Sequence, residues 1–345
     1  MGQSIIPKPP RATRQVATAN GATNLNLGKI KIPLEKGNLV SEHVFDVSIS
    51  QTWGANAPTS SDVRDAFSLI ELVSDIFGTL ISVPFAQFYD AMRFTEDTPV
   101  PVVALGAGGG AAATARFIFD LHHSMDSATM DLVTALQTAE HGSLYVQLTC
   151  APDAANMFKG GSGTVGVATY NVIVQEECFP SWSGKNVTAG GIQYGEASQM
   201  FKSLEESTGV AAVKEPSVLL ETGGRLRFLV LHAYNMTGAV PVLANGILDQ
   251  VSSLEIRGVD YLKNVTAEAI QGRNVTCRGF NQTGVYVIDF GDDHRGWPDI
   301  KGLNEVRLKY KTKATAPASW KIQIVQNFVR GITTALGHKP RRNKQ

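Results

Sequence analysis

Hydrophobic and polar positions alternate through most of the chain. In the segment Val44–Ser50, for example, Phe45, Val47 and Ile49 alternate with polar or smaller residues, a period of two that predicts a β-strand with one buried face. The same reasoning predicts strands at Ile30–Leu34, Val44–Ser50, Phe67–Val83 (two pieces broken at Gly78), Arg116–His122, Leu144–Cys150, Thr164–Gln175, Leu226–His232, Val240–Leu243, Ser253–Val259, Val275–Phe280, Val285–Phe290, Val306–Tyr310 and Trp320–Phe328.

Helical spacing is limited to three segments. Pro84–Phe94 opens with a proline, which suits the first turn of a helix, and Asp126–Glu140 and Glu196–Val213 have helical character. Strands that recur every 8 to 20 residues, roughly, with few helices between them favour an all-β sandwich or barrel. A jelly roll, with two packed antiparallel sheets, is one such fold.

The two halves of the chain close in a similar way. SLYVQLTCAP is followed by a loop and GTVGVATYNVIVQEE, and GVYVIDFGDD is followed by a loop and SWKIQIVQNFV. We therefore expect two consecutive jelly-roll β-barrels with a few short helices. The expected organisation is a basic N-terminal arm (1–29), a first jelly roll (30–179), a Gly- and Ser-rich connector (180–215), a second jelly roll (216–330) and a basic C-terminal tail (331–345).

Charge is distributed unevenly. Residues 1–29 carry four Lys or Arg, residues 306–345 carry ten, neither segment has an acid, and the formal net charge of zero leaves −14 for residues 30–305. This asymmetry indicates an anionic partner, such as nucleic acid or lipid headgroups, for the two ends. Charged residues amount to 18% of the chain, below the ~25% of typical soluble domains, which indicates a surface largely covered by partners.

The cysteines and targeting signals favour a reducing compartment. Cys150, Cys178 and Cys277 match no zinc or CxxC spacing, so we expect idle thiols. No apolar run reaches the ~18 residues of a membrane span, and no signal peptide is recognisable. The sequons are therefore expected to be unmodified; they lie at Asn186, Asn235, Asn264, Asn274 and Asn281.

A glycine-rich stretch imitates a nucleotide-binding turn. Gly106, Gly108 and Ala111 match GxGxxA after a strand. The stretch lies within an all-β pattern, however, and no second strand ends in an acid about 20 residues later. We interpret it as a flexible loop and expect no cofactor.

Two groups of residues imitate metal sites. His122 and His123 lie near Asp120 and Asp126, but adjacent residues of a strand point to opposite faces, so the two histidines cannot chelate one ion together. A second, acidic group could bind Ca²⁺ but lacks EF-hand spacing; it consists of Asp289, Asp292, Asp293 and His294. We therefore predict no metal site, leaving Ca²⁺ at the acidic loop open, and no catalytic residue.

Three stretches carry a resemblance to a known family. Ile70–Arg93, SLYVQLTCAP with its following strand, and Gly284–Val329 resemble the double jelly-roll major capsid proteins of tailless icosahedral viruses, especially bacteriophages with an internal membrane. The resemblance implies a homotrimer with a pseudo-hexameric footprint that self-assembles into a virion shell, together with minor capsid and penton proteins, after synthesis in the host cytoplasm. It also implies inward-facing ends that contact membrane lipids or genome through Lys8, Arg11, Arg14, Lys339, Arg341, Arg342 and Lys344.

Two other functions are compatible with the sequence. Trp53, Trp182, Trp297 and Trp320 lie in or beside predicted loops, and exposed tryptophans would suit a carbohydrate- or receptor-binding β-sandwich protein, such as a spike. An enzyme with two jelly-roll lobes is the third hypothesis, since jelly rolls also occur in glycosidases.

Overall fold

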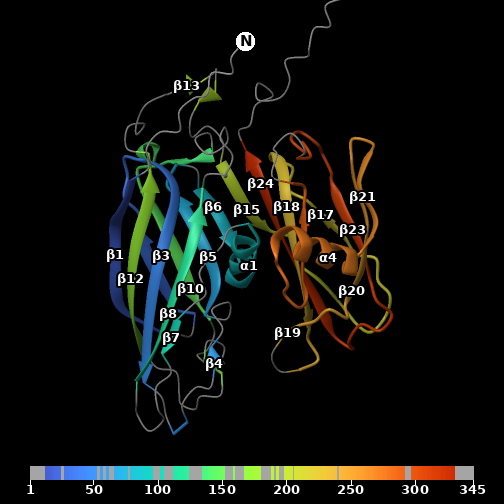
Figure 1. Ribbon diagram of the computed structural model, residues 1–345, viewed down its shortest axis with the longest axis horizontal. Coiled ribbons are helices and arrows are strands. Elements are labelled where there is room, and N and C mark those ends of the chain that lie inside the picture. The colour runs from blue at the N-terminus through green and yellow to red at the C-terminus, as the bar shows by residue number, and fades with distance from the viewer. Residues whose placement is uncertain are drawn as a thin grey trace, which may run out of the picture. The chain divides into compact units, whose positions relative to one another are not determined.

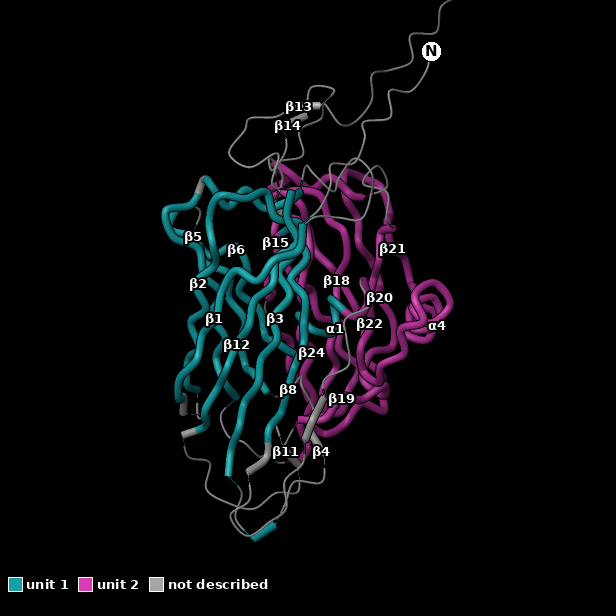
Figure 2. Tube along the Cα trace, turned by 60° about the vertical axis from the view of Figure 1, so that its left-hand side comes forward, with its two compact units in different colours: residues 1–92, 96–199, 333–345 teal, residues 93–95, 200–332 magenta. Residues whose placement is uncertain are grey.

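The computed structural model divides the chain into two compact units (Figure 2). Unit 1 comprises residues 1–92, 96–199 and 333–345, and unit 2 comprises residues 93–95 and 200–332. The structure describes residues 12–24, 27–52, 55–56, 60–61, 66–76, 78–95, 102–104, 112–123, 134–151, 158–159, 167–179, 188–189, 192–193, 198–204, 206–238, 241–291 and 297–330.

Unit 1 is built from long antiparallel strands (Figure 1). One sheet has the order β1-β12-β3-β8-β7, with β9 paired to β3; the other set has the order β6-β5-β10-β2. The strands are β1 (Ala12–Asn24), β2 (Lys29–Pro33), β3 (Leu39–Thr52), β5 (Phe67–Ser74), β6 (Gly78–Val83), β7 (Val102–Ala104), β8 (Ala112–His122), β9 (Leu136–Gln137), β10 (Leu144–Cys150) and β12 (Val167–Cys178). Short ladders join β4 (Ser60–Ser61) to β11 (Phe158–Lys159) and β13 (Thr188–Ala189) to β14 (Ile192–Gln193).

An aromatic cluster forms the core of unit 1. Phe45 and Phe119 are register partners on β3 and β8, and their stacked rings lie 5.0 Å apart. Phe67, from β5, meets Phe117, from β8, edge-on at 5.8 Å. Contacts of this kind add to the apolar area that these large side chains bury, and they fix the inward face of each strand.

The predicted helix at Pro84–Phe94 is present as α1 (Phe85–Thr95). Phe85 is fully buried and packs on Phe119 at 5.2 Å between ring centroids. Among the described residues, no helix is long and apolar enough to cross a membrane.

Unit 2 contains two further groups of antiparallel strands. One has the order β19-β18-β24, with β22 paired to β18 and β16 to β24; the other has the order β17-β23-β20-β21. The strands are β15 (Ser198–Ser203), which crosses the boundary between the units, β16 (Ser207–Gly209), β17 (Ser217–Leu219), β18 (Arg225–Asn235), β19 (Val242–Leu243), β20 (Leu248–Ile256), β21 (Val259–Thr266), β22 (Val285–Asp289), β23 (Arg307–Thr312) and β24 (Trp320–Arg330).

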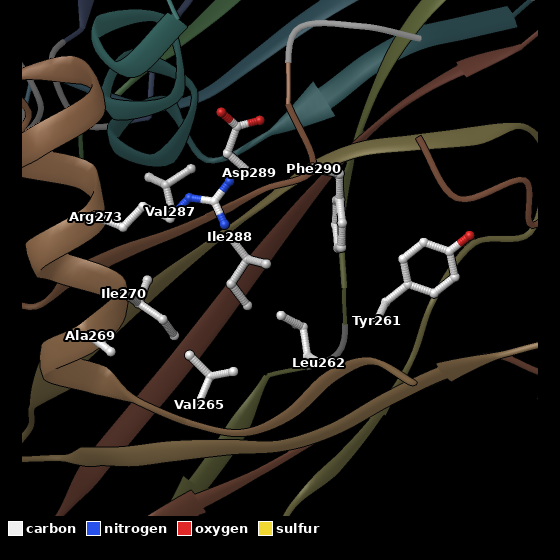
Figure 3. A pocket seen from close by; sticks show the side chains of 10 residues that line it. All are labelled: Tyr261, Leu262, Val265, Ala269, Ile270, Arg273, Val287, Ile288, Asp289 and Phe290. Atoms are coloured by element: carbon white, nitrogen blue, oxygen red, sulfur yellow. The ribbon is translucent and has the colours of Figure 1, made fainter. Parts of the chain in front are cut away.

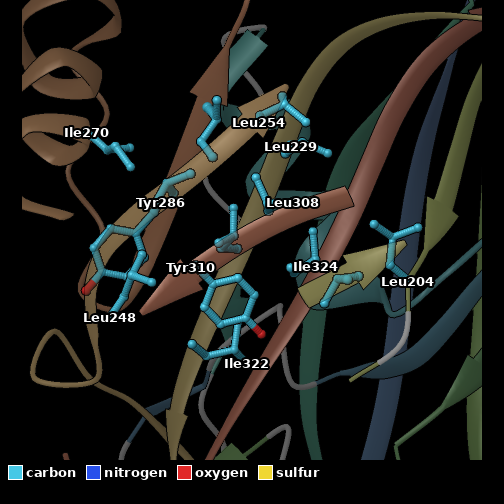
Figure 4. Packing of buried hydrophobic residues seen from close by; sticks show 14 of the residues in the cluster. Leu204, Leu229, Leu248, Leu254, Ile270, Tyr286, Leu308, Tyr310, Ile322 and Ile324 are labelled. Carbon is cyan, nitrogen blue, oxygen red and sulfur yellow. The ribbon is translucent and has the colours of Figure 1, made fainter. Parts of the chain in front are cut away.

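The core of unit 2 is mainly aliphatic. Leu229 and Ile324, from neighbouring strands, are fully buried, and Leu308 and Tyr310 come from the inward face of β23 (Figure 4). The alternation predicted for Val306–Tyr310 is confirmed, because Arg307 and Lys309 on the same strand are exposed. Each unit therefore has its own hydrophobic core.

The strand predicted at Val275–Phe280 is wrong, because this segment ends helix α4 (Ala267–Arg278). Thr266 caps the start of the helix by accepting a hydrogen bond from the Ala269 amide at 3.2 Å. Gly279 adopts a left-handed φ of 64°, and its amide donates to the Val275 carbonyl at 2.9 Å. These two caps outweigh the β-branched Val275 and Thr276.

The predicted helix at Glu196–Val213 is also wrong, since β15 and β16 occupy part of it. Ser207 and Thr208 pair with Ile322 and Lys321 of β24, and this tertiary pairing overrides a weak local preference. Of the helix predicted at Asp126–Glu140, Thr134 is helical, and the described residues that follow Ala135 are β9 and a 3₁₀ turn at Thr138–Glu140. Residues 126–133 lie outside the described residues.

The N-terminal arm expected at 1–29 contains strand structure where the structure describes it. Ala12–Asn24 is strand β1, paired with β12 from Ala12↔Cys178 to Asn24↔Val167, and β2 begins at Lys29. Pairing with the alternating β12 supplies the backbone hydrogen bonds that an isolated Ala- and Thr-rich segment lacks. The connector expected at 180–215 likewise contains β15 and β16.

Candidate functional site

Of the basic residues expected to contact lipid or genome, Arg14 alone lies among the described residues. The other six, outside them, are Lys8, Arg11, Lys339, Arg341, Arg342 and Lys344. The Arg14 guanidinium donates from Nε to Glu176 Oε1 at 2.7 Å, and its Nη2 lies 3.5 Å from Glu35 Oε2. Arg14 is thus bound within unit 1, while its expected external contact stays a prediction.

A buried polar network extends inward from Arg14. The Glu176 side chain has no exposed surface, and its Oε1 also accepts a hydrogen bond from Asn38 Nδ2 at 2.6 Å. Asn38 in turn forms two hydrogen bonds with the Thr138 hydroxyl. The backbone amide of Asn38 donates to Thr138 Oγ1 at 2.9 Å, and Thr138 Oγ1 donates to the backbone carbonyl of Asn38 at 2.8 Å. Buried carboxylates need such partners, so this network ties β1 and β12 to the residue that precedes β3 and to the 3₁₀ turn at Thr138–Glu140.

Two buried histidines continue the network on the inner face of the sheet. His43 Nδ1 and His123 Nε2 lie 2.8 Å apart, and His43 Nε2 lies 3.9 Å from Glu176 Oε2. Burial lowers the pKa of His43 to about 3. The pKa of His123 is lowered well below its usual value by burial and by neighbouring histidines, His43 first among them. Both rings are therefore neutral at pH 7, and in the hydrogen bond between them one facing nitrogen donates and the other accepts.

The outer face of the same sheet carries a second group of titratable residues. His122 Nε2 lies 3.6 Å from Glu42 Oε1 and 4.0 Å from Asp120 Oδ2, and the ligand atoms of all three residues lie within 4.8 Å of one another. Burial raises the pKa of Asp120 to about 6. The structure confirms that His122 and His123 differ in environment: His122 is partly exposed and His123 is buried. It places Glu42 beside His122, which local sequence spacing did not indicate.

The acidic loop and the glycine-rich stretch are the remaining candidate sites from the sequence, and the structure describes only part of them. Asp289 is engaged within unit 2, since its Oδ1 accepts from the Gly291 amide at 2.9 Å and its Oδ2 lies 3.5 Å from Arg278 Nη2. Calcium binding at the acidic loop stays untested, because Asp292, Asp293 and His294 lie outside the described residues. So do Asp126 and the GxGxxA residues Gly106, Gly108 and Ala111.

The two tryptophans that the structure describes are buried. Trp297 and Trp320 are 4% and 1% exposed, and their indole N–H groups donate to the carbonyls of Gly291 and Val210 at 2.6 and 2.9 Å. Neither offers a ring face to a sugar. Trp53 and Trp182 lie outside the described residues.

A small cavity lies in unit 2 between α4, the β20–β21 hairpin and β22 (Figure 3). It has a volume of about 250 Å³, below the ~300–1,000 Å³ of typical small-molecule sites. Leu262, Val265 and Ile270 line its interior, and Arg273 and Asp289 lie at one side. The lining contains no nucleophile with an adjacent base, so it does not favour catalysis.

Comparisons with known proteins place the fold. No family model matches the chain, and no curated protein matches it. The chain is similar to the crystal structure of the major capsid protein (MCP) of Sulfolobus Turreted Icosahedral Virus (STIV), with a TM-score of 0.66 and 13% identity over 96% of this chain and 100% of that chain. The chain has the double jelly-roll fold. A crystal structure of the major capsid protein P2 from bacteriophage PM2 is also similar, with a TM-score of 0.59 and 11% identity over 94% and 99% of the two chains.

A double jelly roll accounts for the repeat seen in the sequence. PBCV-1 VP54, fitted into a reconstruction of the virophage Sputnik, matches with a TM-score of 0.58 and 13% identity over 95% of this chain and 96% of that chain. The predicted fold class, two consecutive jelly rolls, is confirmed, and the similarity spans both units. At this level of identity the double jelly-roll fold, rather than any particular residue, is what the proteins share.

Proposed function

We propose that this double jelly-roll protein is the major capsid protein of an icosahedral virus, and that it self-assembles as pseudo-hexameric trimers into the virion shell. The observation that carries the proposal is coverage: capsid proteins of three viruses match more than nine-tenths of this chain and of their own. A lobe shared with an unrelated enzyme would match one unit only. The expected role is therefore structural, in the virion, and the protein catalyses no reaction.

The surface of unit 2 supports contacts between copies. Large apolar side chains are exposed there: Val210, Val213, Leu219, Val242, Val259, Tyr261 and Val275. When a partner covers exposed apolar surface, the free energy falls by about 25 cal/mol per Å² of apolar area removed from water. Association of many copies would cover such side chains, and the low charge content of the chain fits the same role.

The proposal is tested by measuring the mass of the purified protein. Size-exclusion chromatography with light scattering should give three times 37.0 kDa, and electron microscopy should show pseudo-hexagonal particles or shells. A stable monomer that binds glycans on an array would overturn the capsid proposal and favour the carbohydrate- or receptor-binding alternative. The buried indoles of Trp297 and Trp320 weigh against that alternative.

We further propose that the basic ends contact the inner partners of the shell, membrane lipids or genome, while minor capsid and penton proteins complete the lattice. The residues involved are Lys8, Arg11, Arg14, Lys339, Arg341, Arg342 and Lys344, and Arg14 also has a structural role through its hydrogen bond to Glu176. Each basic residue contributes about 1 kcal/mol near an anionic membrane. Replacing the four residues in 331–345 by glutamine should therefore weaken vesicle binding by about a thousandfold.

Two binding assays distinguish the two partners: one uses vesicles that contain phosphatidylserine, and the other uses double-stranded DNA of equal charge density. A loss confined to vesicles indicates lipid, and a loss confined to DNA indicates genome. Binding that is unchanged by the glutamine substitutions would overturn the proposed role of residues 331–345.

A further inference from the structure

A carboxylate–histidine cluster lies on the outer face of the larger sheet of unit 1. Glu42 on β3 and His122 on β8 are direct register partners, and such cross-strand pairs place their Cβ atoms about 5 Å apart. Asp120 lies two residues before His122 on β8, so its side chain leaves the same face of the strand. Two neighbouring strands thereby bring three metal-binding side chains to one point of the sheet.

The distances in this cluster suit a shared cation better than hydrogen bonds. His122 Nε2 lies 3.6 Å from Glu42 Oε1 and 4.0 Å from Asp120 Oδ2, both longer than the 2.7–3.2 Å, roughly, of a hydrogen bond. Ligand atoms about 2.0–2.1 Å from a tetrahedral ion lie about 3.3 Å from each other. The ligand atoms of the three residues lie within 4.8 Å of one another, so side-chain rotations that move these atoms by about 1 Å would bring them into coordination range.

The burial of Asp120 supplies an independent reason for a cation at this point. The residue is 9% exposed. Among the described residues, no lysine or arginine lies within ion-pair distance of its carboxylate, and the basic side chain at that distance is His122. A buried carboxylate without a cation is costly. The next acid along the outer face of β3, Asp46, differs in this respect, because Arg116 holds it in a two-pronged ion pair at 2.6 and 2.8 Å.

We propose that Glu42, Asp120 and His122 form a binding site for a divalent transition-metal ion of the zinc class. One imidazole nitrogen and two carboxylate oxygens suit zinc, whereas magnesium and calcium prefer oxygen ligands alone. Three protein ligands leave a fourth position for water. The ion would join β3 to β8 across the outer face of unit 1, and the proposal is independent of the proposed capsid function.

The test is metal binding to the full-length protein after removal of metals with EDTA. Isothermal titration with Zn²⁺, followed by dialysis and elemental analysis, should give one equivalent per chain, and Co²⁺ should produce visible absorption bands. His122→Ala and the near-isosteric Asp120→Asn should each remove this equivalent. Asp46→Asn, which removes a carboxylate from the same face, is the matched control and should retain it.

Three results would overturn the proposal. They are wild-type protein that binds no Zn²⁺, an equivalent that persists in both cluster variants, and preferential binding of Ca²⁺ or Mg²⁺. Circular dichroism of each variant checks its folding, and Glu42→Gln provides a third substitution if either of the others unfolds.

Discussion

Replacing Arg14 by alanine separates its structural role from a role in assembly. Glu176, which accepts the Arg14 hydrogen bond, has no exposed side-chain surface, whereas 43% of the Arg14 side chain is exposed. Removing one partner of a fully buried ion pair costs about 3–5 kcal/mol, and exposed pairs contribute about 0–1 kcal/mol. Because solvent screens Arg14 and Asn38 still donates to Glu176, we expect unit 1 to lose about 2 kcal/mol of unfolding free energy.

Urea unfolding and thermal melting measure this loss. At about 2–4 °C per kcal/mol for a domain of this size, the melting temperature should fall by about 4–8 °C. Arg11→Ala removes the same charge three residues earlier and serves as the matched control, with stability expected to be unchanged. If Arg14→Ala is as stable as the wild-type protein, and both variants lose binding to anionic vesicles equally, the structural assignment of Arg14 is refuted.

Three further predictions follow from burial. As the pH falls from 6.5 to 3, the unfolding free energy of wild-type unit 1 should decrease relative to that of His43→Gln by up to about 1.4 kcal/mol per pH unit. The reason is that folded His43, with a pKa of about 3, stays neutral while the histidine of the unfolded chain binds a proton. Equal urea unfolding midpoints for the two proteins across this pH range, measured in EDTA, would contradict this. Unassembled native protein should react with a thiol reagent at Cys277, which is exposed, and not at Cys178, which is buried. Burial and the neighbouring Glu176 raise the pKa of the Cys178 thiol to about 11. A titration that finds two reactive thiols per chain would contradict this. Phe119→Ala should cost about 3–5 kcal/mol in chemical denaturation, because the ring is fully buried; a loss below about 1 kcal/mol contradicts it.

Strands with strict alternation could be predicted closely from the sequence. Leu144–Cys150 has the predicted bounds as β10, and Phe67–Val83 divides at the predicted break into β5 and β6, with Gly78 at a φ of 68°. Alternation is informative here because each of these strands has one face in a core and one outside it, so the burial requirement is written locally into the residues.

Segments whose structure depends on remote partners could not be predicted in the same way. Ala12–Asn24 has no apolar period, and it is a strand because β12 offers it a long edge. In α4, Val275 and Thr276 favour a strand locally, whereas the caps at Thr266 and Gly279 decide for a helix. The caps lie within the sequence, so a search for capping residues before β-propensity would have found this helix.

The candidate metal site shows the same limit on a smaller scale. Alternation alone correctly separates His122 from His123, and it rules out joint chelation by that pair. It cannot identify the third side chain, because Glu42 reaches His122 only through the register of β3 against β8. A slip of one residue in that register would place His43 opposite His122 and turn Glu42 toward the aromatic core. The stacking of Phe45 on Phe119 opposes such a slip, so the packing of the inner face determines which ligands meet on the outer one.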